Sequence, residues 1–326
     1  MNDHNSKLSE LLADGIKFDP HYLPSMNSDH LPMTLCAMAG LGASTEQLLE
    51  FRSDYSKILR SVASDLESKS IGLEADQWRE LIGKPEGYAR LLSFLVREIG
   101  DTGIDPVVRK YLPEFIESLA FAAFHPIIRL GYALEAGSSE EVAASLAYLI
   151  TTHREMPVGS HRKIDLEAVL NAQVKAGKMI EMKSFGATLL ELITQGRYPD
   201  GCARDFAVCA QISFAIYRST RNFFALHMVT ATYAVRTCAG YMDESRALAA
   251  LTHALLGAHL IVGSPGFDST NSMPVPDRLD LPHAYKYLYV CLKEYQQTGD
   301  ERYLSEIRGF CAGGLVPDWV AASLVD

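Results

Sequence analysis

Four histidines lie in apolar segments spread along the chain, where an imidazole without a partner is costly. They are His30, His125, His227 and His283. Taken singly, each is most simply interpreted as a core histidine whose nitrogens are satisfied by neighbours. Taken together, they could supply four imidazoles from four helices, which is how helical bundles assemble metal sites. Imidazole suits iron, copper, zinc or nickel better than magnesium or calcium, so the set points to a transition metal.

A lysine follows the last of these histidines at a spacing that places both on one face of a helix. Lys286 is three residues after His283, and residues separated by three or four positions are neighbours on a helix surface. An ammonium group beside a metal ligand would repel the cation. Three interpretations remain open: Lys286 turns to the surface, its amine is neutral, or carbon dioxide converts it to an anionic oxygen ligand.

Two further polar side chains follow His125 along one helical stripe. Arg129 is four residues on and Tyr132 is seven residues on. The planar guanidinium of Arg129 could steady a phenolate or enolate, and Tyr132 could help to orient a substrate. An ion pair between Arg129 and a nearby acid such as Glu135 is an equally good interpretation.

Small residues follow His227 on its own helical face. Ala231 and Ala234 could leave room for a flat ligand, or could allow two helices to pack closely. The remaining histidines carry weaker signals. The expected surface histidines are His4, His21, His153 and His161, and the expected core or contact histidines are His253 and His259.

Helical periodicity dominates the sequence, and the alternation typical of strands is nearly absent. Helix starts are indicated by Ser44 with Gln47 and by Ser138 with Glu141, both of which have the spacing of a capping box. Asp243 is a third candidate cap. These signals predict an all-α fold of roughly a dozen helices.

Two longer loops are expected, at residues 156–163 and 264–280. The second combines glycine and proline with polar residues and is a candidate lid or surface loop. We expect one large helical domain over residues 1–326, with a possible division into two packed halves near residues 155–165.

The charge balance excludes some classes of partner. With 30 basic and 40 acidic residues the formal net charge is −10, and no basic cluster stands out. Nucleic acid and anionic membrane surfaces are therefore not expected partners. The most apolar stretch, residues 248–263, is too short to span a bilayer. The polar first residues lack the apolar segment of a signal peptide, so we expect a cytoplasmic protein.

Cysteine usage and motif content narrow the function further. The six cysteines are scattered and form no CxxC pair, which favours free thiols in a reducing compartment. The sequence contains no nucleotide-binding GxGxxG, no P-loop, no HExxH and no GxSxG elbow. An ExxH pair of the di-iron bundle type is also missing.

The histidine segments resemble those of the questin oxidase-like family, in an order and spacing that cover about 250 residues. The segments that carry the resemblance are HLPM at 30–33, LGAS at 41–44, FHPIIRLGYALE at 124–135, HMVT at 227–230 and HAYK at 283–286.

The resemblance implies an all-α oxidoreductase that oxidises polycyclic aromatic ketones of polyketide type. Family members that open an anthraquinone ring are described either as NADPH-dependent Baeyer–Villiger enzymes or as iron-dependent oxygenases. Carried over to this chain, the resemblance makes the metal ligands His30, His125, His227 and His283, with Lys286 as an unusual oxygen donor.

The sequence therefore predicts a metal-dependent oxygenase that uses a transition metal, iron in the first instance, and dioxygen. Its substrate would be an aromatic or polyketide-like small molecule. Two alternatives stay open. One is a metal-free, NADPH-dependent oxidoreductase in which the histidines act as acids and bases. The other is a non-catalytic helical protein that binds a hydrophobic small molecule.

Overall fold

The computed structural model describes residues 3–22, 27–62, 73, 77–157, 159–176, 184–268 and 272–322. Over these residues the fold is all-α, as the periodicity predicts. The α-helices are α1 (Asp3–Gly15), α2 (Leu31–Gly40), α3 (Thr45–Tyr55), α5 (Tyr88–Thr102), α6 (Ile104–Phe115), α7 (His125–Ala136), α8 (Ser139–Thr151), α9 (Leu166–Ala176), α10 (Phe185–Thr194), α11 (Phe206–Thr220), α12 (Phe223–Cys238), α13 (Glu244–Ile261), α14 (Leu281–Thr298), α15 (Glu301–Ala312) and α16 (Asp318–Ala322).

Short elements complete the described part of the chain. The 3₁₀ turns are η1 (Ser56–Ile58), η2 (Gln77–Leu81), η3 (Pro85–Gly87), η4 (Ile116–Ser118), η5 (Phe121–Phe124) and η6 (Ala239–Tyr241). The strands β1 (His21–Tyr22) and β2 (Asn27–Ser28) form a small antiparallel pair, in which His21 lies opposite Ser28.

The helix starts follow the capping signals in the sequence. Ser44 and Gln47 form the predicted capping box at the start of α3. Asp243 accepts hydrogen bonds from two backbone N–H groups at the start of α13. At α8 the Ser138 side chain accepts the Glu141 N–H. The Glu141 carboxylate, however, pairs with Arg129 rather than completing a box.

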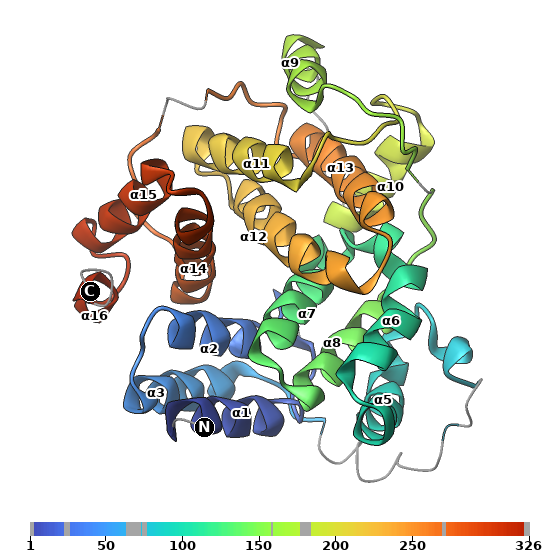
Figure 1. Cartoon of the computed structure of the whole chain (residues 1–326), viewed down its shortest axis with the longest axis vertical. Coiled ribbons are helices and arrows are strands. Elements are labelled where there is room, and N and C mark those ends of the chain that lie inside the picture. Colours follow the sequence, from blue (N-terminus) through green and yellow to red (C-terminus); the bar gives the residue numbers. More distant parts are fainter. Residues whose placement is uncertain are drawn as a thin grey trace.

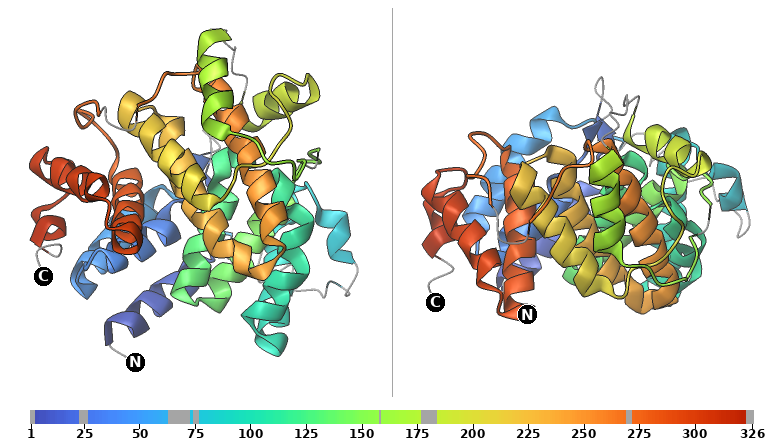
Figure 2. Two further views of the ribbon diagram at one scale, coloured as in Figure 1. Left: turned by 45° about the horizontal axis from the view of Figure 1, so that its top comes forward. Right: turned by 90° about the horizontal axis from the view of Figure 1, so that it is seen from above.

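Helix α12 lies in the middle of the bundle (Figure 1), where it contacts α7 and α14 as well as α11 and α13. The N-terminal helices α1 and α2 pack against α8 and α7, and α14 packs against α2. The two further views show the C-terminal helices α14–α16 together at one side of the molecule (Figure 2). Segments far apart in the sequence therefore surround the start of α7.

One close approach sets the distance between α7 and α12. A Cβ atom added to Gly131 would lie 2.7 Å from Cβ and 2.8 Å from Cα of Ala234, which is closer than carbon atoms pack in proteins. Glycine at this position lets the two helices touch. The small residues after His227 could make room for a ligand or let helices pack closely, and Ala234 serves helix packing.

The described residues of the two expected loops, 156–163 and 264–280, contain no helix. The hydrophobic core is continuous and draws residues from both sides of the expected boundary near 155–165, from Leu11 to Val320. The division into two halves stays a prediction. Among the described helices, none has the length and apolar character that a membrane crossing requires.

Candidate metal centre and its cavity

The four histidines meet at the N-terminal ends of four helices. His30 caps α2, His125 is the first residue of α7, and His227 and His283 lie near the starts of α12 and α14. Their rings form a closed circuit, in which the centroids of successive rings are 4.8 Å (His30–His125), 4.9 Å (His125–His227), 5.1 Å (His227–His283) and 4.5 Å (His283–His30) apart. Residues separated by more than 250 positions therefore form one buried cluster.

Hydrogen bonds fix the orientation of three of these rings. Nδ1 of His125 lies 2.6 Å from the Ala122 carbonyl oxygen, and Nδ1 of His227 lies 2.9 Å from the Phe223 carbonyl oxygen. Nδ1 of His283 lies 2.6 Å from Oδ1 of Asp280. A carbonyl or carboxylate oxygen can only accept, so each Nδ1 must carry the hydrogen. Because burial lowers the pKa of all three rings, they are neutral, and each Nε2 holds a free lone pair.

Unprotonated Nε2 atoms point into the cluster. Nε2 of His30 is 2.7 Å from Nε2 of His125, a hydrogen-bond distance, so Nε2 of His30 carries the hydrogen that Nε2 of His125 accepts. Nε2 of His227 and Nε2 of His283 are buried without any hydrogen-bond partner. One ligand nitrogen from each of His30, His125 and His283 can be chosen so that all three lie within 4.8 Å of one another. Outward Nδ1–H bonds and inward Nε2 lone pairs are the pattern of metal-binding histidines, so the residues fit a metal ion.

Lys286 lies beside this cluster in the interior. Its side chain is 0% exposed and its Nζ has no hydrogen-bond partner, so the interpretation of Lys286 as a surface lysine is wrong. Burial lowers the pKa of its amine to about 7. The charge of Lys286 in turn lowers the pKa of His30, His125 and His283 further, after their own burial. The neutral amine and the carboxylated lysine remain as interpretations.

A strained turn aims the carbonyl that holds His125. Ala122, Ala123 and Phe124 have φ angles of 48°, 51° and 68°, in the left-handed region that residues with a Cβ rarely adopt. The turn is η5, which leads directly into α7. Three such residues in a row persist only where their surroundings hold them, and strain of this kind gathers at functional sites.

Arg129 and Tyr132 have partners inside the protein. Arg129 forms a buried ion pair with Glu141, through Nε and through Nη2 at 3.0 Å. The expected partner Glu135 instead pairs with Lys293. The Tyr132 hydroxyl donates to the Lys286 carbonyl oxygen at 3.1 Å. Neither side chain lines the cavity described below, and their role in orienting a substrate stays a prediction.

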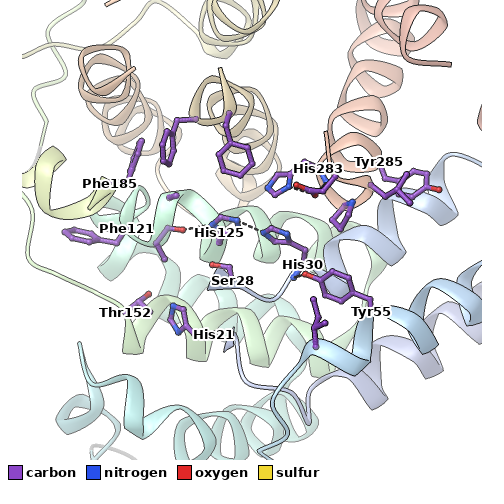
Figure 3. A pocket seen from close by; sticks show the side chains of 18 of the residues that line it. His21, Ser28, His30, Tyr55, Phe121, His125, Thr152, Phe185, His283 and Tyr285 are labelled. Atoms are coloured by element: carbon purple, nitrogen blue, oxygen red, sulfur yellow. Dashed lines mark hydrogen bonds and ion pairs between the residues drawn. The ribbon is translucent and has the colours of Figure 1, made fainter. Parts of the chain in front are cut away.

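A cavity of about 1430 Å³ opens onto the histidine cluster. Figure 3 shows Phe121 and Phe185 on one side of His125, and Tyr55 and Tyr285 on the other side, beyond His30. Aromatic rings thus flank the histidines on both sides, and ring faces pack well against flat ligands. A cavity larger than most small-molecule pockets, with a few polar groups at its centre, is suited to a ligand of several fused rings.

Two residues of this site escaped the sequence interpretation. His21, expected at the surface, lines the cavity and is hydrogen-bonded to the buried Tyr148. Nothing in the local sequence distinguishes it. Asp280 caps α14 and holds His283, and its position three residues before that histidine, just ahead of Leu281 and a proline, is a helix-start signal that could have identified it.

The other histidines have structural partners. His153 bonds Ser118, His253 bonds Asp200, and His259 bonds Gln173. His161 is exposed, as expected, and the side chain of His4 lies outside the described residues. The described residues thus bring together the four histidines of the apolar segments and leave these others apart.

Fold and site define an all-α protein in which a buried histidine cluster faces a small-molecule cavity. The chain belongs to the questin oxidase-like family, whose model matches residues 27–300. That segment contains all four histidines and Lys286. The family identifies the protein as an oxidoreductase of the oxidase or oxygenase class that acts on polyketide-like small molecules. No curated protein matches the chain.

Proposed function

We propose that the protein is a metal-dependent oxygenase, with one non-haem iron held by His30, His125, His227 and His283. The substrate would be an aromatic or polyketide-like ketone, oxidised by ring opening or by Baeyer–Villiger insertion. The observation that supports this most directly is the set of inward Nε2 lone pairs, of which those of His227 and His283 are buried without partners. Buried polar atoms of this kind are costly unless a ligand satisfies them.

Iron bound by these nitrogens would supply a redox-active centre for dioxygen. The protein's own groups hold the histidine rings in place and position the substrate. The oxygen atoms that accept from Nδ1 of His125, His227 and His283 hold each ring in place and keep its Nε2 unprotonated. The aromatic walls on both sides of the cluster position a planar substrate over the histidines and exclude water from it.

Lys286 completes the set in this proposal. A neutral amine can add to carbon dioxide: a bond forms between Nζ and carbon, one C=O π bond breaks to leave an anionic oxygen, and the proton that leaves the nitrogen passes to water, so that a carbamate remains. The lowered pKa of Lys286 provides the neutral amine, and the unpartnered Nζ is free to react. The carbamate would offset the positive charge of the metal, which an ammonium group cannot do.

Metal content tests the proposal. Protein purified without a histidine tag should contain close to one iron, or one other transition metal, per chain by inductively coupled plasma mass spectrometry. His227→Ala and His283→Ala should each lose it. His153→Ala is the matched control, because that histidine is also hydrogen-bonded and partly buried but lies outside the cluster.

Oxygen uptake with a hydroxylated anthraquinone should then follow the metal content across these variants. Wild-type protein that holds no metal after anaerobic iron loading would contradict the proposal. NADPH-dependent turnover by metal-stripped protein would replace it with the metal-free alternative.

A further inference from the structure

One side of the cavity is lined by aromatic rings from three helices that are distant in the sequence. They are Phe51 and Tyr55 of α3, Tyr285 of α14 and Trp319 of α16. Figure 3 shows two of these rings, Tyr55 and Tyr285, beyond His30. We call the part of the cavity that these rings line the α3 arm.

The rings of the α3 arm pack into one continuous surface. Phe51 and Tyr55 are nearly parallel, with ring centroids 5.5 Å apart and 20° between their planes. Tyr285 and Trp319 form a second such pair, at 5.7 Å and 21°. Phe51 joins the two pairs, because its ring meets that of Tyr285 at 6.4 Å in a perpendicular arrangement. Rings prefer such stacked and edge-to-face partners, so this surface suits a further aromatic ring.

The α3 arm is long. The residues that line the cavity along α3 and the turn after it recur every three or four positions, at Gln47, Glu50, Phe51, Asp54, Tyr55 and Ile58. That spacing is one face of a helix, and at about 1.5 Å per residue the face extends over about 16 Å. The whole cavity, at about 1430 Å³, also exceeds the roughly 300–1,000 Å³ of most ligand pockets. It therefore has room for more than one fused ring system.

Apolar side chains at the open edge of the cavity continue this surface. Of the five large hydrophobic side chains that the described residues leave exposed, three line the cavity: Ile58, Phe223 and Leu281. Ile58 comes one turn after Tyr55, and Leu281 comes one turn before Tyr285. Apolar side chains that are exposed side by side at a cavity mark a surface that a ligand covers.

Carboxylates limit the charge that a group in the α3 arm can carry. Glu50 and Asp54 are exposed and lie on the same face of α3 as Phe51 and Tyr55. Asp54 pairs with Lys57, but Glu50 adds a second negative charge to this face. Because like charges repel, a negatively charged group is disfavoured here.

We propose that the α3 arm is a subsite for a second aromatic unit of the substrate, one without negative charge, that is linked to the ring system beside the histidines. The substrate would then consist of two linked aromatic units. This inference rests on the proposed function, which places a planar aromatic ketone over the histidines. The second unit would stack on the rings of Phe51 and Trp319 and would set which end of the ketone faces the histidines.

Binding to metal-free protein tests the subsite, with probes that share one ring system. The compact probe is 1,8-dihydroxyanthraquinone, and the extended probe carries a 2-phenylethyl group on carbon 3. By isothermal titration calorimetry, the wild type should bind the extended probe at least about tenfold more tightly than the compact probe. A carboxylate on the phenyl ring should remove that gain. A 2-cyclohexylethyl group, which has the same number of carbon atoms but is not flat, should gain less.

Substitutions in the two parts of the cavity should separate the two units of the ligand. In Phe51→Leu and Trp319→Leu, the extended probe should bind at most about threefold more tightly than the compact probe, because one stacking ring is lost. Phe224→Leu is the matched variant on the other side of the histidines, where Phe224 lines the cavity and stacks on Phe185 at 5.3 Å. It should weaken both probes by a similar factor and keep the tenfold difference.

Equal affinity of the wild type for the compact and extended probes would overturn the subsite. An equal gain from the cyclohexyl group would also overturn it, because the arm would then accept any hydrocarbon. If neither probe bound, the substrate class of the proposed function would fail together with the subsite. Because the experiment needs neither metal nor oxygen, a protein that holds no iron could still pass it.

Discussion

The Nε2 atoms of His30 and His125 lie 2.7 Å apart, although Nδ1 of His125 already holds the Ala122 carbonyl oxygen. The second ring therefore has no hydrogen to offer on Nε2. Two neutral rings meet in this way when Nε2 of His30 carries the hydrogen and donates it to Nε2 of His125. A metal ion bound by the cluster would replace that hydrogen, in a region where burial makes protonation of the rings unfavourable.

This arrangement predicts how the stability of the metal-free protein changes with pH. Burial lowers the pKa of His283 from 6.5 to about 4, so in mildly acidic solution the unfolded chain binds a proton that the folded chain does not. The free energy of unfolding therefore falls as the pH drops below 6.5 towards 4. Between about pH 7.5 and about pH 5.5, the free energy of unfolding of His283→Gln should fall by roughly 1 kcal/mol less than that of the wild type.

Urea unfolding of the metal-free protein at the two pH values measures the change. His161→Gln, at an exposed position, should lose stability as the wild type does. Identical pH dependence in the wild type and in His283→Gln would show that His283 ionises normally in the fold.

Asp280 should matter for metal affinity beyond its role as a helix cap. Its Oδ1 accepts both the His283 backbone N–H at 3.1 Å and the imidazole Nδ1 at 2.6 Å. Asp280→Ala should weaken metal binding about 10- to 100-fold, because outer partners of ligand histidines typically contribute that much. Titration with cobalt(II), followed by its visible absorbance, measures the affinity.

Asp243→Ala provides the comparison, since Asp243 caps α13 through the same kind of backbone hydrogen bonds but contacts no ligand histidine. Both variants should lose about 1 kcal/mol of stability with their caps. If both also kept the wild-type cobalt affinity, Asp280 would be a cap and nothing more.

The sequence predicted much of this fold, because helical periodicity and capping are local properties. Ser44 with Gln47 and Asp243 mark helix starts within a few residues of chain. The four histidines could be selected because their apolar neighbours imply burial. Their mutual distances, and the burial of Lys286, depend on how four separate helices pack, which no local pattern encodes.

Other features had no local signal at all. His21 belongs to a polar segment and is partly buried only because β1 and β2 fold it against α8. The left-handed turn at Ala122 and Ala123 contains no glycine or asparagine, the residues that usually indicate such a turn in a sequence. Only the surrounding tertiary structure holds such a turn in place, which is why sequence patterns do not predict it.

We expect the buried amine of Lys286 to lower the stability of the metal-free protein and to strengthen metal binding. An amine buried without a partner is costly, so Lys286→Met, which keeps the length of the side chain and removes the amine, should raise the stability of the metal-free protein by about 1–3 kcal/mol. The same variant should bind metal more weakly. Thermal unfolding of metal-free protein and cobalt titration measure the two effects, and a less stable Lys286→Met protein would mean that the amine has a partner.

Carboxylation of Lys286 is tested by carbon-13 NMR of protein incubated with labelled bicarbonate. A carbamate resonance should appear in the wild type and be missing in Lys286→Met. Absence of the resonance from metal-loaded wild-type protein would leave Lys286 as a neutral amine and remove it from the ligand set.

The contact between Gly131 and Ala234 predicts that helix spacing controls the site. Gly131 lies on α7 after His125, and Ala234 lies on α12 after His227, so the glycine sets how closely the two histidines approach. Gly131→Ala would place its methyl carbon 2.7 Å from the Ala234 Cβ and force the helices apart. Overpacking of this kind costs about 1–3 kcal/mol, and the separated rings should bind cobalt(II) at least about tenfold more weakly, a difference of 1.4 kcal/mol.

Gly100→Ala is the matched control, because Gly100 is also inside a helix, α5, but an added Cβ there meets no other atom within 4 Å. That substitution should leave cobalt affinity unchanged and raise stability by up to about 1 kcal/mol, the usual gain of alanine over glycine in a helix. A Gly131→Ala protein that is destabilised but binds cobalt as tightly as the wild type would mean that His125 and His227 reach the metal independently of the distance between α7 and α12.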